Sequence, residues 1–243
     1  MLALSTQRET IDALRQQLHF WEVARRPTLP PFSSGCEALD RLLPGRAFQR
    51  GTLTEFLADT GIAATALGLI AARQACLDGA TLVVVDRGWS FYPPAANTFG
   101  IDLGSTIFIR PRTRKDELWA LHQSLSCKGV GAVLCWPDKL DGRAFRALQL
   151  AAESSGSVGV FIRSLCVRGH PTWSDMQLLV EARPALNTTR RLRIEVVRCR
   201  NGHAGATVEL ELDDETGTLQ ESRTVSLAPS MAIAAIAPST ARA

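Results

Sequence analysis

Residues Thr52–Ala75 read TLTEFLADTGIAATALGLIAARQA, and this stretch decides the fold. It begins as an apolar strand, turns through a short loop around Gly61, and continues as a long amphipathic helix. A strand that feeds a helix through glycine and small residues is the frame of a phosphate-binding loop, whose backbone N–H groups hold phosphate oxygens at the helix start. The stretch therefore predicts an α/β domain built around a nucleotide-type site.

The loop keeps this frame but lacks its charged chemistry. A working G-x-x-x-x-G-K-[ST] loop ends in a lysine that reaches the terminal phosphates and a hydroxyl that holds magnesium. Here no lysine is present, Asp59 adds a negative charge, and Thr65 is the only remnant of the metal-binding chemistry. We interpret the loop as an emptied nucleotide site and expect no cofactor. Its residues are Asp59, Thr60, Gly61, Ile62, Ala63, Ala64 and Thr65.

Composition limits the remaining possibilities. A chain of 243 residues that is 46% hydrophobic and 21% charged can bury one substantial core. Its net charge of +3 is too small to indicate nucleic-acid binding by itself. The six cysteines include no C-x-x-C pair and the four histidines lack metal-ligand spacing, so no metal site is predicted. No apolar run approaches the roughly 20 residues of a membrane span, and no signal core is seen, so we expect a cytoplasmic protein without membrane contact.

Residues 1–26 are predicted to form one helix, which a Pro-rich linker over residues 27–32 separates from the core. Its apolar residues recur at helical spacing and form one stripe. The stripe consists of Ile11, Leu14, Leu18 and Trp21. The helix could pack on its own core or serve as a docking arm for another subunit.

Residues 33–226 alternate between buried strands and helices. The strands after the central helix are expected at residues 80–85, 107–109, 131–136 and 157–163. Asp116 is expected to cap the helix that precedes the third of these strands. This alternation predicts a mostly parallel sheet with helices on both faces. Three later segments alternate like half-exposed strands and predict an antiparallel extension. They span residues 176–182, 191–200 and 207–212.

Residues 227–243 are rich in alanine, proline and serine, which is typical of a disordered tail. The apolar residues Met231, Ile233 and Ile236 within them could instead form a short helical recognition peptide. After the stripe of the N-terminal helix, this segment is the second candidate for a partner-binding surface.

The order of these pieces resembles the core of RecA-type recombinases. The likeness begins at SSGCEALD, residues 33–40, which is similar to that family's S-T-G-x-x-x-L-D motif, and it runs to about residue 219. Within that superfamily, the lost phosphate loop, the small size and the N-terminal helix with its linker resemble ImuA. ImuA proteins are RecA-like accessory proteins encoded with ImuB and a DnaE-type polymerase in bacterial mutagenesis cassettes. The resemblance implies a RecA-like three-layer core.

Departures from an active recombinase argue against ATP hydrolysis. Besides the missing lysine, Gly88 stands where that family has its catalytic Glu, and Trp136 stands where a magnesium-linked Asp would end a strand. Phosphoryl transfer depends on positioned charge and metal, so losing such elements removes orders of magnitude in rate. We therefore expect a protein that is not an enzyme. Trp89, Phe91 and Tyr92 are expected to fill the volume of the nucleotide, or to meet a partner if they are exposed.

The DNA-binding loops of recombinases follow the third and fourth of those strands, and the resemblance places them here at residues 137–142 and 165–173. Basic side chains in and beside these loops could make a few salt-sensitive, sequence-blind phosphate contacts. They are Lys139, Arg143, Arg146, Arg163, Arg168 and His170. The alternative interpretation is that these are solvated surface residues.

The resemblance to ImuA implies a non-catalytic adaptor in SOS-induced, error-prone translesion synthesis. The implied partners are an ImuB-like inactive Y-family polymerase, the DnaE-type polymerase and RecA, with non-specific DNA contact and self-association as further possibilities. A SulA-like inhibitor of cell division that binds the tubulin-like division protein is the alternative, because such proteins also lack nucleotide chemistry. A third hypothesis is an ATPase with a rearranged loop that uses Thr60, Thr65 and Asp138.

Overall fold

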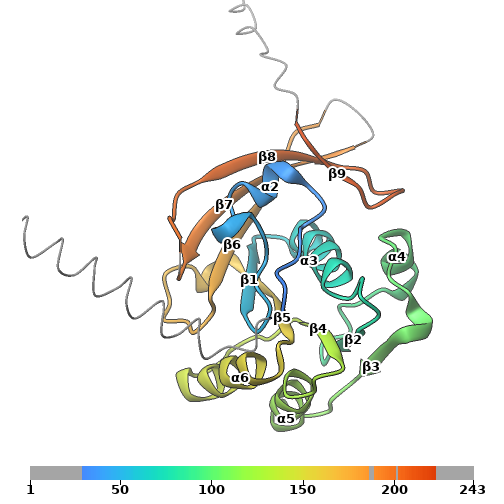
Figure 1. Cartoon of the computed structure of the whole chain (residues 1–243), viewed down its shortest axis with the longest axis vertical. Helices are drawn as coiled ribbons and strands as arrows, with labels where there is room; N and C mark the ends of the chain where they lie inside the picture. Colours follow the sequence, from blue (N-terminus) through green and yellow to red (C-terminus); the bar gives the residue numbers. More distant parts are fainter. Residues whose placement is uncertain (1–28, 186–188, 201, 223–243) are drawn as a thin grey trace, which may run out of the picture.

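The computed structural model describes residues 29–185, 189–200 and 202–222 (Figure 1). The predicted N-terminal helix with its stripe of Ile11, Leu14, Leu18 and Trp21 lies outside the described residues. The tail with Met231, Ile233 and Ile236 lies outside them as well, so both assignments stay predictions. Within the described part of the chain, no helix combines the length and apolarity that a membrane span requires.

The described strands form one nine-stranded sheet in the order β3-β2-β4-β5-β1-β6-β7-β8-β9 (Figure 1). Neighbouring strands pair in parallel from β3 to β6 and antiparallel from β6 to β9. The predicted mostly parallel sheet with an antiparallel extension is therefore confirmed. The strands are β1 (Leu53–Ala58), β2 (Thr81–Val85), β3 (Thr106–Ile109), β4 (Val130–Cys135), β5 (Val158–Ser164), β6 (Met176–Arg183), β7 (Arg190–Cys199), β8 (Thr207–Leu212) and β9 (Leu219–Glu221).

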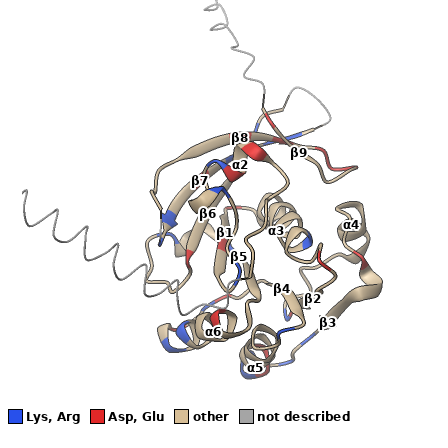
Figure 2. Ribbon diagram, in the orientation of Figure 1, with Lys and Arg blue, Asp and Glu red and all other residues tan. Residues whose placement is uncertain are grey.

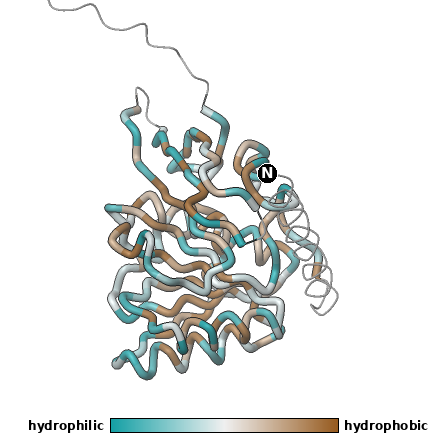
Figure 3. The backbone as a smooth tube through the Cα atoms, turned by 90° about the vertical axis from the view of Figure 1, so that its left-hand side faces the viewer, coloured by the Kyte–Doolittle hydropathy of each residue, from teal (hydrophilic) through white to brown (hydrophobic). Residues whose placement is uncertain are grey.

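Helices cover both faces of the parallel part, which makes three layers. The helix α3 (Gly61–Ala75) lies on one face, and α5 (Arg114–Leu125) and α6 (Gly142–Ser155) lie on the other. Alternate residues of the strands serve the two cores: in β2, Val84 packs in the cluster around α3, whereas Val83 packs with α5 and α6. Because both faces are covered, these strands are almost continuously hydrophobic, as the interior of Figure 3 shows.

The helix α3 is buried over most of its circumference, so the expected amphipathic pattern is wrong. The sheet covers one side, and the short helix α2 (Glu37–Asp40) and the curled strands β7 to β9 enclose it further (Figure 1). Small side chains allow this close packing: a Cβ on Gly68 would lie 2.6 Å from the Cδ1 atom of Ile162 in β5. Helices enclosed on several sides are apolar all round.

The motif at residues 33–40 has a structural role. Asp40 is buried, and its carboxylate accepts hydrogen bonds from the hydroxyl of Ser33 and from the backbone N–H of Ser34. These bonds fold the segment back on itself so that Leu39 enters the core against α3. The motif therefore closes the chain onto the central helix.

Two local expectations are corrected by the structure. The strand β6 pairs in parallel with β1 and is buried on both faces from Met176 to Val180, so it belongs to the parallel core and is not half-exposed. The antiparallel extension begins one strand later, at β7. The cap of α5 is Thr113, whose hydroxyl accepts from the N–H of Asp116 in a capping box; Asp116 lies inside the helix.

Candidate functional site

The loop interpreted as an emptied nucleotide site carries no positive charge at the start of α3. Thr60 precedes the first turn of α3, and its side chain makes no capping hydrogen bond. Ile62 follows in that turn with 69% of its surface exposed, whereas Ala63 and Ala64 are buried beneath it. The free N–H groups of the helix start are thus flanked by an uncovered aliphatic side chain and by the exposed carboxylate of Asp59.

The hydroxyl of Thr65 in the loop is bonded to Trp136, the residue expected to stand in place of a metal-linked Asp. The indole nitrogen of Trp136, which directly follows β4, donates to the hydroxyl oxygen of Thr65 over 3.2 Å. The same indole packs against Phe91, with ring centroids 6.2 Å apart. An aromatic ring therefore stands where a magnesium site would require carboxylate and hydroxyl oxygens. Among the described residues, no cluster of His, Cys, Asp or Glu could hold a metal ion.

Asp86, which directly follows β2, binds backbone N–H groups of the next loop. Its carboxylate is buried and accepts from the N–H groups of Ser90 and Phe91, both at 2.9 Å, which folds the loop after β2 onto the sheet. At Gly88 there is no side chain to act as a base. The neighbouring Trp89 has a left-handed backbone (φ 57°), and its exposed ring lies 3.7 Å from the guanidinium carbon of Arg110.

An apolar hollow of about 390 Å³ opens beside the first turn of α3. Its lining includes Ile62, Leu69, Tyr92, Phe99, Trp136 and Arg190. The expectation that Trp89, Phe91 and Tyr92 fill the nucleotide volume is wrong for two of the three. Phe91 is buried, but Trp89 and Tyr92 stay exposed at 71% and 68%, so the volume is left open.

Two of the three groups that a rearranged ATPase loop would use have other partners. Thr65 is bonded to Trp136, and Asp138 forms an ion pair with Arg87 on the surface. The guanidinium of Arg87 also bonds to the buried carboxylate of Glu117 over 2.9 Å, which raises the pKa of Arg87 further above its usual range. Arg87 thus ties the loop after β4 to α5.

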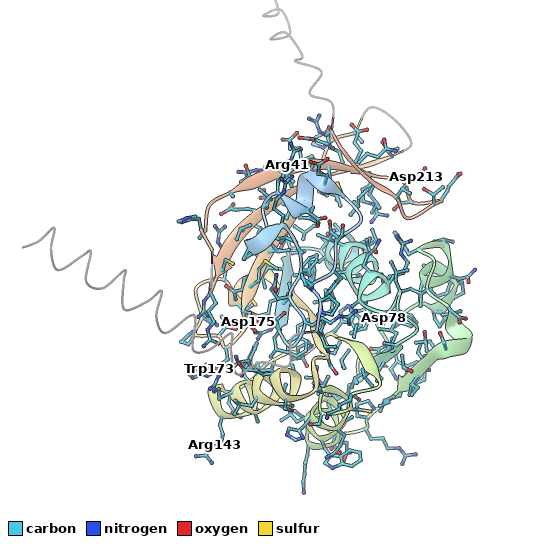
Figure 4. The ribbon with its side chains drawn as sticks, in the orientation of Figure 1. Arg41, Asp78, Arg143, Trp173, Asp175 and Asp213 are labelled. Carbon is cyan, nitrogen blue, oxygen red and sulfur yellow. The ribbon has the colours of Figure 1, made fainter. Side chains whose placement is uncertain are left out.

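The predicted DNA-contact residues divide into three groups. Lys139, Arg143 and His170 are exposed, and Arg143 extends away from the body of the protein in Figure 4. Arg146 lies over the ring of Trp173 at 4.9 Å, and Arg168 is paired with Glu195 in β7. Arg163 is the third case, because its side chain is mostly buried.

The assignment of Arg163 to DNA contact is corrected by the structure. Its side chain is only 9% exposed and bonds to Glu55 in β1 over 2.5 Å. Glu55 is fully buried and also accepts from Thr172, Ser174 and Gln177. The network fastens the end of the loop after β5 to the central strand. Sequence reasoning missed Glu55 because it lies among apolar residues of β1 and has no basic partner nearby in the chain.

Trp173 was also missed as part of this surface. Its ring lies against the first turn of α6, where a Cβ on Gly142 would be 3.8 Å from the indole nitrogen. The two loops that follow β4 and β5 therefore meet at the N-terminus of α6. The helix carries Arg143 and Arg146, and Figure 2 shows blue on α6. The available signal in the sequence was a tryptophan within the polar loop GHPTWSD, residues 169–175.

The chain is similar to known proteins over about three quarters of its length. No family model matches the chain. Protein ImuA of Caulobacter vibrioides, in two strains, is 27% identical over 206 residues, which is 76% of this chain and 84% of the relative. The resemblance to ImuA is confirmed. Protein RecA of Chlorobaculum parvum is 27% identical over 155 residues, which is 55% of this chain and 45% of that protein.

A solved structure has a similar fold. The crystal structure of the RadB recombinase superposes with a TM-score of 0.62 at 16% identity, covering 79% of this chain and 99% of that one. The core is therefore RecA-like, as the resemblance implied. The ImuA-like chain combines this core with an indole, that of Trp136, bonded to the hydroxyl of Thr65.

Proposed function

We propose that the protein is a non-catalytic RecA-fold adaptor in SOS-induced, error-prone translesion synthesis. Its partners in this proposal are an ImuB-like inactive Y-family polymerase, a DnaE-type polymerase and RecA, in the cytoplasm. The observation that carries the proposal is the bond from Trp136 to Thr65, because it puts an indole at the metal position of a preserved core. Similarity to ImuA over three quarters of the chain supports the setting.

Assays of nucleotide binding and hydrolysis test the proposal that the protein is not an enzyme. Isothermal titration with ATP and Mg²⁺ is expected to give no binding heat, and a phosphate-release assay no hydrolysis above buffer. An active RecA protein under the same conditions is the control. Binding at micromolar affinity would instead favour the rearranged ATPase loop.

The outer edge of β3 supports a role in protein binding. Within the described residues, no strand pairs with this edge, and the strand carries neither charge nor proline. Ile107 and Phe108 are partly exposed on it. Natural proteins usually protect such edges, and an uncovered one can receive a strand from a partner. Arg110 and Arg112 follow directly, so a partner segment with acidic residues would be favoured.

Complex formation tests the partners. The purified protein is mixed with the ImuB-like polymerase or with RecA and analysed by size exclusion and crosslinking, and a complex with at least one is expected. Ile107→Lys should abolish the complex formed at the edge, whereas Leu150→Lys on the exposed face of α6 should leave it intact. A paired Leu14→Asp, Leu18→Asp variant tests the predicted docking stripe. Absence of any complex with the unmodified protein would refute the adaptor role.

The proposal also includes weak DNA contact at the N-terminus of α6. Trp173 supplies a stacking surface, and Lys139, Arg143 and Arg146 supply positive charge beside it. With about three phosphate contacts, the logarithm of the affinity for single-stranded DNA should fall with the logarithm of salt at a slope of about −2. Arg143→Ala should reduce the magnitude of that slope by about 0.7. Arg46 is an exposed arginine beside Glu37, and Arg46→Ala should leave the slope unchanged.

The SulA-like alternative has no specific support among the described residues. It predicts filamentous cells on overexpression and inhibition of the division protein's GTPase in vitro. Both results together would replace the adaptor proposal.

A further inference from the structure

The hollow beside the emptied loop is an apolar site without an assigned occupant. Its volume of about 390 Å³ is at the small end of the range for ligand pockets, roughly 300–1,000 Å³. Ile62 and Tyr92 stand at it with 69% and 68% of their surfaces exposed, and Leu69 and Phe99 contribute to its walls. Such a concentration of exposed apolar surface in one concave place marks a binding site.

The polar groups at the hollow do not suit a nucleotide. Arg190 is the charged residue among the described lining, and it is already paired with Asp214 over 2.9 Å. The hydroxyl of Thr65 is engaged by Trp136. The N–H groups at the start of α3 and the hydroxyls of Ser90 and Tyr92 remain at the hollow, but the pairing of Arg190 leaves a phosphate without an unpaired cation, and a buried charge without a partner is costly. Aliphatic side chains are the chemistry that this lining accepts.

The C-terminal part of the chain passes close to the hollow. The turn between β8 and β9, in which Figure 4 labels Asp213, lies against Phe99, the residue that follows α4 (Pro93–Thr98). A Cβ on Gly217 in that turn would lie 2.9 Å from the Cα atom of Phe99, which lines the hollow. From Gly217 the chain runs through β9 to Ser222, where the described part ends.

The chain after Ser222 is long enough to reach back to the hollow. Five residues of strand from Gly217 to Ser222 carry the chain at most about 17 Å from the hollow's wall. Met231 follows nine residues after Ser222, and nine extended residues span about 30 Å. The segment Met231–Ile236 reads MAIAAI and carries no charge, and Met231, Ile233 and Ile236 provide three large apolar side chains.

We propose that the hollow beside the emptied phosphate loop binds the apolar segment Met231–Ile236 of the same chain. The segment covers Ile62 and Tyr92, and its aliphatic side chains occupy the volume between α3 and α4. The occupant of the former nucleotide site is then a part of the protein itself, and its removal exposes apolar surface next to Trp136. This goes beyond the adaptor role, which does not depend on it.

Hydrogen exchange followed by mass spectrometry tests the proposal on the full-length protein. Peptides that cover residues 61–69 and 93–99 should exchange at least about tenfold faster in the double variant Ile233→Asp, Ile236→Asp than in the unmodified chain. Thr240→Asp adds the same type of charge outside the apolar segment and should exchange like the unmodified chain. A synthetic peptide of residues 229–238 added to the double variant should restore slow exchange.

Controls separate the possible occupants. Protection that is independent of protein concentration supports binding within one chain, whereas protection that increases with concentration would assign the hollow to a second copy and overturn the proposal. Equal exchange in all three proteins would overturn it as well. Circular dichroism should show unchanged folding, because the substitutions alter none of the described core residues, and peptides from β4 and β5 provide an internal reference.

Discussion

Replacing Glu55 by alanine should destabilise the protein strongly. Glu55 is fully buried, and its carboxylate accepts from Arg163 at 2.5 Å, Gln177 at 2.7 Å, Ser174 at 2.8 Å and Thr172 at 2.9 Å. The substitution leaves the nearly buried guanidinium of Arg163 without its counter-ion. Removing one partner of a buried ion pair typically lowers the free energy of unfolding by about 3–5 kcal/mol.

The hydroxyls of Thr172 and Ser174 soften this effect slightly, because they also bond to each other over 3.0 Å. We therefore expect a loss of about 4 kcal/mol, a large part of the roughly 5–15 kcal/mol that stabilises a typical domain. At about 2–4 °C per kcal/mol for a chain of this size, the melting temperature should fall by about 8–16 °C. Urea unfolding followed by circular dichroism and tryptophan fluorescence measures the change.

Two comparisons make this prediction decisive. Glu181→Ala removes an exposed partner of Arg183 and Arg193 and should change the free energy of unfolding by less than about 1 kcal/mol. The double variant Glu55→Gln, Arg163→Met should be destabilised by less than the sum of its single changes, because no uncompensated charge remains. A loss below about 1 kcal/mol for Glu55→Ala would refute the argument that this pair is desolvated and fastens the loop.

Three further predictions concern the central helix, the cysteines and the indole. Gly68→Ala should lower the free energy of unfolding by about 1–3 kcal/mol in urea titrations, because its Cβ overlaps a side chain of β5. Burial raises the pKa of the Cys76 thiol to about 11, so a maleimide at pH 8 should label exposed Cys127 first and Cys76 about 100-fold more slowly, as peptide mapping would show. Trp136→Phe should lose about 1 kcal/mol by removing the hydrogen bond to Thr65, and an unchanged urea midpoint would show that this bond adds nothing.

The local features of the core were predictable from the sequence. Strand, loop and central helix, the order of later strands, and the antiparallel extension follow from hydrophobic periodicity and turn residues, which act over neighbouring positions. The loss of the loop lysine and the replacements at Gly88 and Trp136 are also visible in the sequence, because identity alone decides which charges are absent. The resemblance to ImuA rested on these same features.

Tertiary structure decided where the remaining side chains point and what they contact. The strand β6 is inserted beside β1, so a segment with an alternating pattern became buried on both faces. Arg163 is withdrawn from solvent by Glu55, which lies 108 residues earlier in the chain. Trp136 meets Thr65 across 71 residues, and the volume beside them stays open because Tyr92 points to solvent. Sequence patterns describe neighbours along the chain, whereas burial and pairing depend on residues that only the closed sheet brings together.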